Sequence, residues 1–349
     1  PRINYDANGE NGALLLEPSR TNLITFSEHL QSSYYGKTRC TIEDNSTTSP
    51  EGVINASKMT STDASESYIQ GNVTTTGTKI SWSFFAKKGD LDYAHGLVWS
   101  SPNGCRQWFN LSTGELGGTT TFGTGYSVDS ASIEDYGNGW YRCTMIVNCS
   151  AGTQGCRVNI SSDDTTIGSA VNSYGYFYGL QAEDASYASS YVPTYGSAVT
   201  RSADSQTLDI TNLLSSTEGT LFFELKDAKS HSATNKILGI GDGSGVDNFF
   251  GLYVANFNTG AVGIRNRQAN ADLMNTAIPN PQNAKVAIKF GASGVKTFLN
   301  GSEFQSSATA YTGWATSFDL STSYGDVDLK KYFLFDSALT DAECISLTS

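Results

Sequence analysis

The strongest constraint on the fold is a series of short runs in which apolar and polar residues alternate. The run Lys79–Ala86 places four apolar side chains on one side, because successive side chains of a strand point to opposite faces: Ile80, Trp82, Phe84 and Ala86. The runs Gly139–Val147 and Thr220–Leu225 repeat the pattern. Long runs of the helix formers Ala, Leu, Glu and Lys do not occur. The sequence therefore predicts an all-β fold.

Composition agrees with many short strands and excludes two classes of partner. Only 16% of the 349 residues are charged, whereas Gly (35), Tyr (18) and Phe (17) are plentiful. The formal net charge of -12 and the lack of a basic stripe argue against nucleic-acid binding. The sequence holds no apolar run near the ~20 residues of a membrane helix, so we expect no membrane insertion.

The stretch Tyr174–Asp204 separates two β patterns. It starts as an aromatic strand that ends near Ala182 and finishes as an extended segment containing Pro193. Because a single core stops growing at roughly 250–300 residues, the length also favours two domains. We predict domains 1–205 and 206–349, joined from Glu183 onward by a stiff linker. Thr340 and Glu343 have the spacing of a capping box, which predicts one short C-terminal helix.

Several ordered motifs follow one another along the first 205 residues: Leu14–Leu23, Ile80–Ala86, Phe109–Leu116, Gly137–Arg142, Gly179–Glu183, Ser190–Thr194 and Thr200–Asp204. Together they resemble a domain of bacteriophage tail and virion-surface proteins that is related to jelly-roll carbohydrate-binding modules. One departure is Leu180-Gln181-Ala182, where that family usually has Ala-Gln-Leu. The resemblance implies a jelly-roll β-sandwich.

The second half has its own set of motifs: Gly219–Phe222, the hairpin Val286–Gly301 and the closing run Phe335–Glu343. These resemble a concanavalin A-like domain of the laminin-G type. The expected fold is thus two β-sandwiches, a jelly-roll carbohydrate-binding-module-like domain followed by a concanavalin A-like domain, with one short C-terminal helix. Fold alone does not determine function.

Aromatic side chains are the natural partners of sugars, since the apolar face of a pyranose packs on an aromatic ring and polar neighbours bind its hydroxyls. The candidate carbohydrate-binding residues are aromatic residues and their polar neighbours: Trp99, Trp108, Arg106, Gln107, Tyr34, Tyr35, Tyr126, Tyr311 and Trp314. For each of them, packing in a core is the competing interpretation.

Two further features have alternative interpretations. Asp242 and Asp247 flank a Gly-containing loop and are candidate Ca²⁺ ligands, but the loop lacks the full spacing of a calcium loop and a plain β-turn competes. We expect no other cofactor. Cys149 and Cys156 either face each other across a hairpin or are buried free thiols.

Five residues are assigned a structural role, which is to hold the first strand, the last strand and the exit segment of the first domain together: Arg20, Trp140, Arg142, Arg201 and Asp204. A planar guanidinium can bind a carboxylate or several carbonyl groups at once.

The sequence offers no constellation for catalysis. His29, His95 and His231 stand in unrelated contexts. The adjacent pairs Glu134-Asp135 and Glu183-Asp184 would point to opposite faces of a strand, so neither can supply the paired carboxylates of a glycosidase. We expect no catalytic residues and a protein that is not an enzyme.

The resemblance implies a function. We expect a fibre or surface protein of the phage particle, extracellular on the virion, that adheres to host cell-surface polysaccharide. Its partners would be the host glycan and other virion proteins, and the usual arrangement of such fibres is a homotrimer. A purely structural virion protein is the alternative, and a polysaccharide lyase or hydrolase is the less favoured one.

Overall fold

The computed structural model describes residues 2–4, 12–214, 217–230, 236–243, 247–256, 261–321 and 325–349. These residues form antiparallel sheets and a single helix, α1 (Asp341–Thr348), so the all-β prediction with one short C-terminal helix is confirmed. The Thr340 side chain accepts a hydrogen bond from Glu343 N, and the Glu343 carboxylate accepts one from Thr340 N, which is the predicted capping box. Within the described residues, no helix is long and apolar enough to span a membrane.

The chain divides into two compact units that differ from the predicted domains at their start. The central unit is Arg20–Arg201, and the terminal unit combines Pro1–Ser19 with Ser202–Ser349. The second boundary lies between Arg201 and Ser202. The first nineteen residues, however, belong with the C-terminal part, because β2 (Ala13–Leu16) pairs with β27 (Gly325–Phe335). The central unit is therefore an insertion in the sequence of the terminal unit.

Two six-stranded antiparallel sheets build the central unit. Strands follow one another in the first sheet in the order β11 (Glu115–Phe122), β10 (Asn103–Asn110), β9 (Tyr93–Ser100), β14 (Gly152–Ser161), β7 (Tyr68–Thr75) and β4 (Gly36–Thr38). The order in the second sheet is β12 (Ser127–Asp135), β13 (Trp140–Asn148), β8 (Lys79–Lys88), β15 (Tyr174–Glu183), β6 (Ile54–Ser61) and β5 (Cys40–Thr48).

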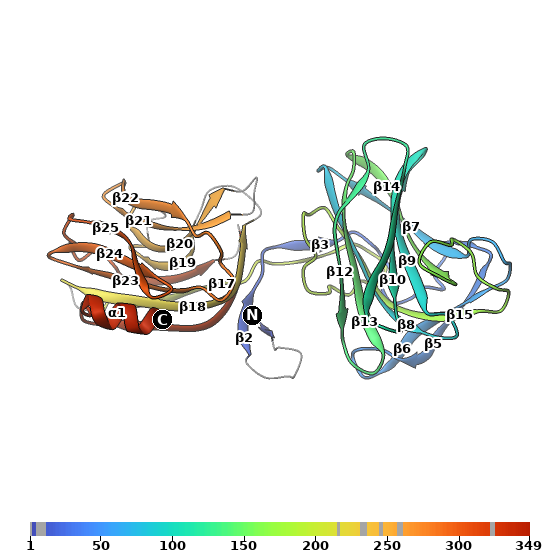
Figure 1. Ribbon diagram of the computed structural model, residues 1–349, viewed down its shortest axis with the longest axis horizontal. Helices are drawn as coiled ribbons and strands as arrows, with labels where there is room; N and C mark the ends of the chain where they lie inside the picture. Colours follow the sequence, from blue (N-terminus) through green and yellow to red (C-terminus); the bar gives the residue numbers. More distant parts are fainter. Residues whose placement is uncertain are drawn as a thin grey trace. The chain divides into compact units, whose positions relative to one another are not determined.

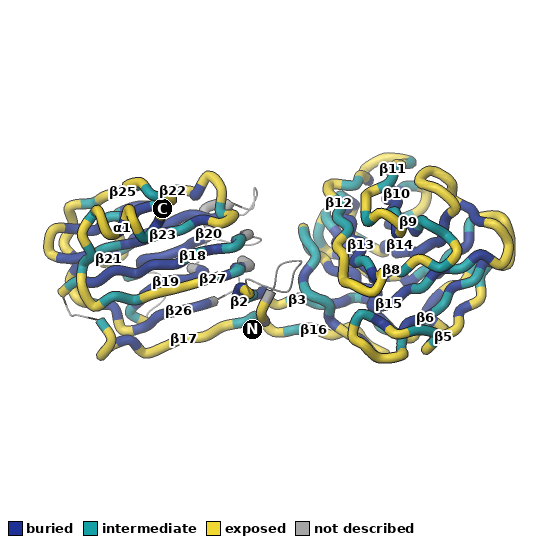
Figure 2. The backbone as a smooth tube through the Cα atoms, turned by 60° about the horizontal axis from the view of Figure 1, so that its bottom comes forward, coloured by how far each residue is buried: buried dark blue, intermediate teal, exposed yellow. Residues whose placement is uncertain are grey.

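Side chains from both sheets form one hydrophobic core in the central unit. Strand β8 contributes the four residues whose alternation the sequence shows, and none of them retains exposed surface: Ile80, Trp82, Phe84 and Ala86. Figure 2 shows the middle strands of this unit as buried and the connecting loops as exposed. The period-two pattern thus identifies the face of β8 that lies in the shared core, although Ser81, Ser83 and Phe85 on its other face are buried too.

The segment after β15 is part of the central unit rather than a linker. It ends in β16 (Val199–Arg201), which pairs with β3 (Arg20–Asn22). The Asn22 side chain is buried and its Nδ2 donates to Leu180 O (3.1 Å) and to Val192 O (2.9 Å). The prediction of a linker from Glu183 onward was wrong, because the hydrogen bond to Val192 and the pairing of β16 with β3 fasten the segment to the unit.

The terminal unit also contains two sheets with a common core. Its seven-stranded sheet has the order β1 (Arg2–Asn4), β2, β27, β18 (Gly219–Ser230), β23 (Lys285–Gly291), β24 (Gly294–Leu299) and β25 (Ser302–Ser307). Its six-stranded sheet has the order β17 (Ser205–Asp209), β26 (Ser317–Ser321), β19 (Lys236–Gly241), β20 (Phe249–Asn256), β21 (Ala261–Gln268) and β22 (Ala271–Ala277). Helix α1 packs through Cys344 on the other face of the larger sheet (Figure 1).

All six cysteines are free thiols. Cys149 directly follows β13 and Cys156 lies within β14, and these two strands belong to different sheets. They therefore do not face each other across a hairpin. Both are buried, as the alternative interpretation has it.

Candidate functional site

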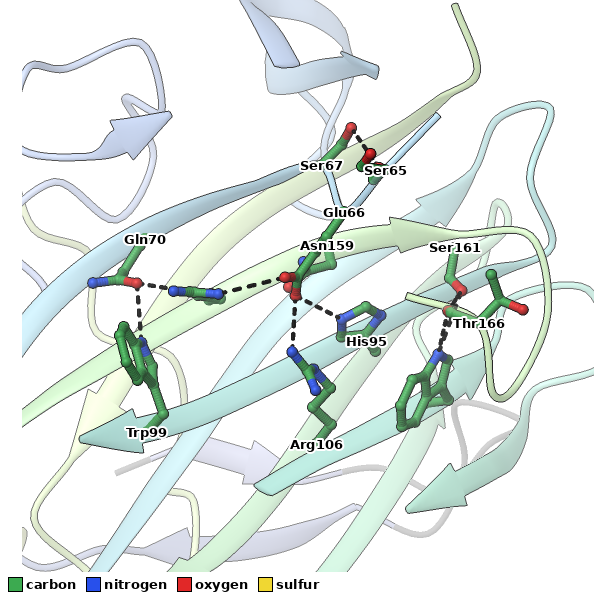
Figure 3. Close-up of polar contacts among 12 residues, drawn as sticks. Ser65, Glu66, Ser67, Gln70, His95, Trp99, Arg106, Asn159, Ser161 and Thr166 are labelled. Carbon is green, nitrogen blue, oxygen red and sulfur yellow. Dashed lines mark hydrogen bonds and ion pairs between the residues drawn. The ribbon is translucent and has the colours of Figure 1, made fainter. Parts of the chain in front are cut away.

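The first sheet of the central unit carries polar and aromatic side chains on the face opposite the core, which we call the outer face. Its strands send alternate residues such as Ile69, Val98 and Val158 into the core. The residues between them gather around Glu66, which lies two positions before β7 (Figure 3). We call this group the Glu66 network: Glu66, Tyr68, Gln70, His95, Trp99, Arg106, Arg157 and Asn159.

Two aromatic rings lie against two glycines in one row across the sheet. Phe122 pairs with Gly104, Gly104 with Trp99, and Trp99 with Gly155. A Cβ atom at Gly104 would lie 2.6 Å from Trp99 Cβ and 2.7 Å from Phe122 Cζ. A Cβ atom at Gly155 would lie 2.4 Å from Trp99 Nε1. The space above each glycine is thus filled by a ring, and only glycine allows this close approach.

The next row places two arginines around one carboxylate. Arg106 pairs with Leu97, and Leu97 with Arg157. Glu66 Oε1 lies 3.1 Å from Arg106 Nη2, and Glu66 Oε2 lies 3.7 Å from Arg157 Nη1. The side-chain amide of Asn159 also donates to Glu66 Oε1 (3.2 Å). One residue from outside the strands thereby joins β10 and β14, which are not neighbours (Figure 3).

The Arg157 guanidinium lies between aromatic rings. It is 3.8 Å from the centroid of the Tyr68 ring and 4.6 Å from that of Trp99. Gln70 Oε1 accepts hydrogen bonds from Arg157 Nε (2.7 Å) and Trp99 Nε1 (3.0 Å). These cation–π contacts and hydrogen bonds hold the rings and the guanidinium in single orientations, so a ligand would meet a preorganised surface.

The electrostatics of the network favour an ionised Glu66. Burial opposes ionisation of this carboxyl, but the interaction with His95 and the charges of Arg106 and Arg157 lower its pKa to about 2. Burial lowers the pKa of His95, which leaves this imidazole neutral at pH 7. Burial also lowers the pKa of Arg157. At neutral pH one carboxylate therefore faces two guanidinium groups.

One end of the outer face is covered. His95 is fully buried, its ring centroid is 4.8 Å from that of Trp108, and its Nε2 is 3.9 Å from Glu66 Oε1. Trp108 Nε1 donates to Thr166 O (3.1 Å) and Ser161 Oγ (3.3 Å). Neither ring nitrogen of His95 has a hydrogen-bond partner among the described residues. Trp99 and Tyr68, by contrast, keep part of their surface exposed.

The structure brings together only part of the predicted site. Trp99 and Arg106 belong to the Glu66 network, and Trp108 shares its face but is buried. Gln107 is on the core side, where its Nε2 donates to Gly117 O (3.0 Å) and its Oε1 accepts from Thr119 (2.7 Å). The sequence neighbours Arg106 and Gln107 therefore point to opposite faces of β10.

The candidate tyrosines of the central unit are bound within the protein. Tyr35 is buried and donates to Phe26 O (2.7 Å), and buried Tyr126 has a 2.6 Å hydrogen bond to Gln154 Oε1. The Tyr34 hydroxyl donates to Asn72 O (3.0 Å). The contacts of these three tyrosines agree with packing inside the protein, which is the competing interpretation.

The two candidates of the terminal unit pack into its core. Tyr311 is buried and its hydroxyl accepts a hydrogen bond from Ala315 N (2.9 Å). Trp314 packs edge-on against Phe250, and its Nε1 donates to Gln268 Oε1 (2.9 Å).

The proposed calcium ligands are partly described. Asp242 Oδ2 accepts a hydrogen bond from Asn248 Nδ2 (2.7 Å), and the Asp247 carbonyl accepts one from Asn270 N (3.0 Å). Residues 244–246 of the loop, like His231, lie outside the described residues. In the part of the chain that is described, no group of three or more His, Cys, Asp or Glu residues could hold a metal ion. Calcium binding by Asp242 and Asp247 stays a prediction.

Three of the residues assigned a structural role contact the segment that follows β15. The Arg20 guanidinium lies 4.6 Å from the ring centroid of Tyr187. Arg142 donates to Ser189 O, and Arg201 donates to Ser190 O (3.3 Å). These contacts fit the role of holding the exit segment.

The other two of these residues bind elsewhere. Trp140 Nε1 donates to Thr48 O (2.9 Å), which lies at the end of β5. Asp204 and Glu17 are joined by two hydrogen bonds, from Asp204 N to Glu17 O (2.8 Å) and from Glu17 N to Asp204 Oδ2 (3.0 Å). Asp204 thus ties together the two sequence segments of the terminal unit.

Sequence reasoning missed most of the Glu66 network. The sequence does not single out Glu66, Tyr68, Gln70, Arg157 or Asn159, and it places His95 in a context unrelated to the other histidines. A signal exists in two strands, since Tyr68 and Gln70, and likewise Arg157 and Asn159, alternate with apolar residues. The sequence does not reveal that these two strands are neighbours.

No family model and no curated protein matches the chain. Similar solved structures include a mutant of Trypanosoma rangeli sialidase with trans-sialidase activity, at 10% identity and a TM-score of 0.33, covering 84% of this chain and 60% of that chain. The Trypanosoma rangeli sialidase itself matches at 11% identity and a TM-score of 0.31, again covering 84% of this chain and 60% of that chain. This chain thus spans about 60% of the length of these neighbours.

The prediction that the chain is not an enzyme is contradicted by these neighbours, which are sialidases, and it is withdrawn. TM-scores near 0.3 nevertheless carry no argument for a particular activity of this chain.

Proposed function

We propose that the chain binds carbohydrate through the outer face of its central unit. The observation that carries the proposal is the row in which Phe122 and Trp99 lie against Gly104 and Gly155, beside the arginine row. Flat aromatic rings next to planar polar groups are what a pyranose requires, since its apolar face packs on a ring while its hydroxyls need donors and acceptors.

Hydrogen-bonding capacity in the network supports the proposal. Arg106 Nε and Asn159 Oδ1 are buried and have no hydrogen-bond partner among the described residues. Buried polar atoms of this kind are usually satisfied by water or a ligand. A sugar hydroxyl can both donate and accept a hydrogen bond. Hydroxyl groups can therefore bind the donor Arg106 Nε as well as the acceptor Asn159 Oδ1.

We further propose that each unit is a β-sandwich, jelly-roll-like in the central unit and concanavalin A-like in the terminal unit. Two antiparallel sheets around one core in each unit support this architecture. Both architectures are common among carbohydrate-binding domains, which agrees with the proposed ligand class.

The biological role that we propose is that of an extracellular component of a phage particle that adheres to host surface polysaccharide. The sequence motifs from Leu14 to Asp204 support this role. A single shallow sugar site binds weakly, so adhesion would gain from several copies, as in a homotrimer held beside other virion proteins.

The test is a glycan array with the full chain, followed by titration calorimetry with the best ligand. Replacing Trp99 with Ala removes the ring above Gly155, and we expect an affinity loss of about tenfold or more, because a desolvated aromatic contact contributes about 1.5 kcal/mol. Tyr195→Ala is the matched control, since this aromatic residue is 73% exposed and is not part of the outer face. Failure of every glycan to bind at millimolar concentration, or full binding by Trp99→Ala, would refute the proposal.

A further inference from the structure

We propose that the outer face recognises an acidic glycan, one whose sugar rings carry carboxylate groups. This inference rests on the proposed function of the face and adds the chemical class of the ligand. It starts from the count of charges: two guanidinium groups, Arg106 and Arg157, are both within 4 Å of one carboxylate, Glu66.

No second acid balances this count within the described residues. The charged groups acting on Glu66 are Arg106, Arg157 and His95, and the only carboxylate acting on Arg157 is Glu66 itself. Because His95 is buried and neutral, the network keeps one uncompensated positive charge. The sign of this local charge is opposite to that of the whole chain, whose formal net charge is -12.

The positive charge is also poorly hydrated. The side chains of Arg106 and Arg157 retain only 16% and 11% of their exposed surface. A guanidinium withdrawn from water is costly unless an anion compensates it. A ligand carboxylate can bring that compensation, whereas a neutral sugar hydroxyl cannot.

Both arginines keep donor capacity for such a carboxylate. The 3.7 Å contact between Arg157 Nη1 and Glu66 Oε2 is longer than a hydrogen bond. Arg106 Nε is without a hydrogen-bond partner in the described part of the chain. A planar guanidinium matches a carboxylate better than it matches a hydroxyl, because two parallel N–H groups can meet the two oxygens.

The spacing of the rows suits a uronic acid. The aromatic row through Trp99 and the arginine row through Leu97 are two residues apart along β9, or about 7 Å. A pyranose packed on Trp99 can therefore direct a ring carboxylate towards Arg106 or Arg157 while its apolar face stays on the indole.

The test compares each acidic ligand with its own neutral form. The probes are oligosaccharides of galacturonate, of alginate and of hyaluronate, each with a carboxyl-reduced counterpart, titrated against the full chain at 50 and 300 mM NaCl. We expect at least one acidic probe to bind tenfold more tightly than its reduced counterpart and to weaken at least threefold at the higher salt concentration.

Variants assign this preference to the face. Arg106→Gln and Arg157→Gln should each abolish the preference for the acidic form. Glu66→Gln should raise affinity for the acidic probe at least threefold, because it removes the competing carboxylate, and misfolding cannot produce such a gain. Arg265→Gln, in the terminal unit, is the control and should leave binding unchanged.

The outcomes separate the two proposals. Equal binding of acidic and reduced forms, or binding only of neutral glycans on the array, overturns the acidic ligand and leaves carbohydrate binding standing. If no acidic, reduced or neutral glycan binds, both proposals fail. A preference for the acidic form that persists in both arginine variants shows that another surface makes the recognition, and it overturns the assignment to this face.

Discussion

Each unit carries a pair of arginines around one carboxylate beside an aromatic ring, but the two arrangements differ in origin. In the terminal unit, Asp272 lies on β22, next to β21 with its two arginines, and accepts hydrogen bonds from Arg265 Nε (2.6 Å) and Nη2 (3.0 Å). Arg265 also lies 4.6 Å from the ring centroid of Tyr253. In the central unit, Glu66 comes from outside the strands and reaches β10 and β14.

The pKa values of Arg265 and Arg157 are shifted in opposite directions. The hydrogen bonds with Asp272 raise the pKa of Arg265, whereas burial lowers the pKa of Arg157. Arg265 forms two hydrogen bonds with Asp272, whereas Arg157 is 3.7 Å from Glu66, whose carboxylate is hydrogen-bonded to Arg106 instead. A cross-strand ion pair of the first kind stabilises a sheet surface, while an undercompensated cluster of the second kind is a candidate for binding.

The largest difference between the units should come from removing residues 1–16. The terminal unit then loses β2 beside β27, including buried Ala13 and Leu16, and exposes a strand edge. We expect this unit to be destabilised by about 4 kcal/mol, since a buried leucine alone contributes about 2–3 kcal/mol. Calorimetric scanning should show one transition lowered and the transition of the central unit unchanged. Equal shifts of both transitions would contradict the division into units.

Acid should affect the central unit through Glu66. Its pKa of about 2 in the folded chain is lower than the value of about 4.3 expected when unfolded. The resulting stabilisation is complete above pH ~4.3 and is lost as the pH falls towards 2, to a total of about 3 kcal/mol. Urea unfolding at pH 5, 3.5 and 2.5 measures it. The variant Glu66→Gln should lack this component, and an unchanged pH dependence in that variant would refute the assignment.

At neutral pH, removal of each carboxylate compares the two clusters directly. Glu66→Gln leaves two largely buried guanidinium groups without an anion and should cost about 2–3 kcal/mol. Asp272→Asn removes a carboxylate that is 38% exposed, and the cost should stay below about 1 kcal/mol because solvent screens the pair. Urea unfolding of both variants tests this contrast. Similar losses of unfolding free energy in the two variants would contradict it.

The smallest expected effect concerns the packing of Trp99. Gly155→Ala places a methyl group where the indole now lies, so the ring must shift, at a cost of about 1–2 kcal/mol. Gly36→Ala is the matched control in β4 of the same sheet, where the nearest atom to a new Cβ is 3.9 Å away. Intrinsic Trp fluorescence and unfolding free energy should change in the first variant alone.

Local patterns in the sequence predicted those structural features that depend on residues close together along the chain. The alternation in Lys79–Ala86 identified a buried face, and Thr340 with Glu343 identified the helix start. The placement of β2 was missed because the apolar run Ala13–Leu16 does not indicate its partner strand, which is chosen by non-local packing. Pro193 suggested a linker, but the hydrogen bond from Asn22 to the preceding Val192 is a tertiary contact.

The sequence predicted only those residues of the candidate site that have a suitable side chain and also lie close together along the chain. Trp99 and Arg106 were recognised as an aromatic residue and a polar neighbour within seven residues. Arg157 and Glu66 complete the site from strands and loops far along the chain, which no spacing rule links to Trp99. Residue type alone does not identify a binding residue, as Trp108 shows. The alternation along β10 places Trp108 on the outer face, but the segment containing Thr166 covers it.

The pairing of Leu14 with Leu329 also sets an order of events during synthesis. A ribosome delivers β2 before Arg20–Arg201 and β27 after it, and Arg20–Arg201 emerges between them as one uninterrupted block. The inserted unit can complete its core while translation continues, and β2, which precedes it, stays unpaired until β27 emerges. The terminal unit therefore completes its sheet only after the central unit has emerged, and a product shortened before β27 would contain the finished central unit with an unpaired strand in front of it.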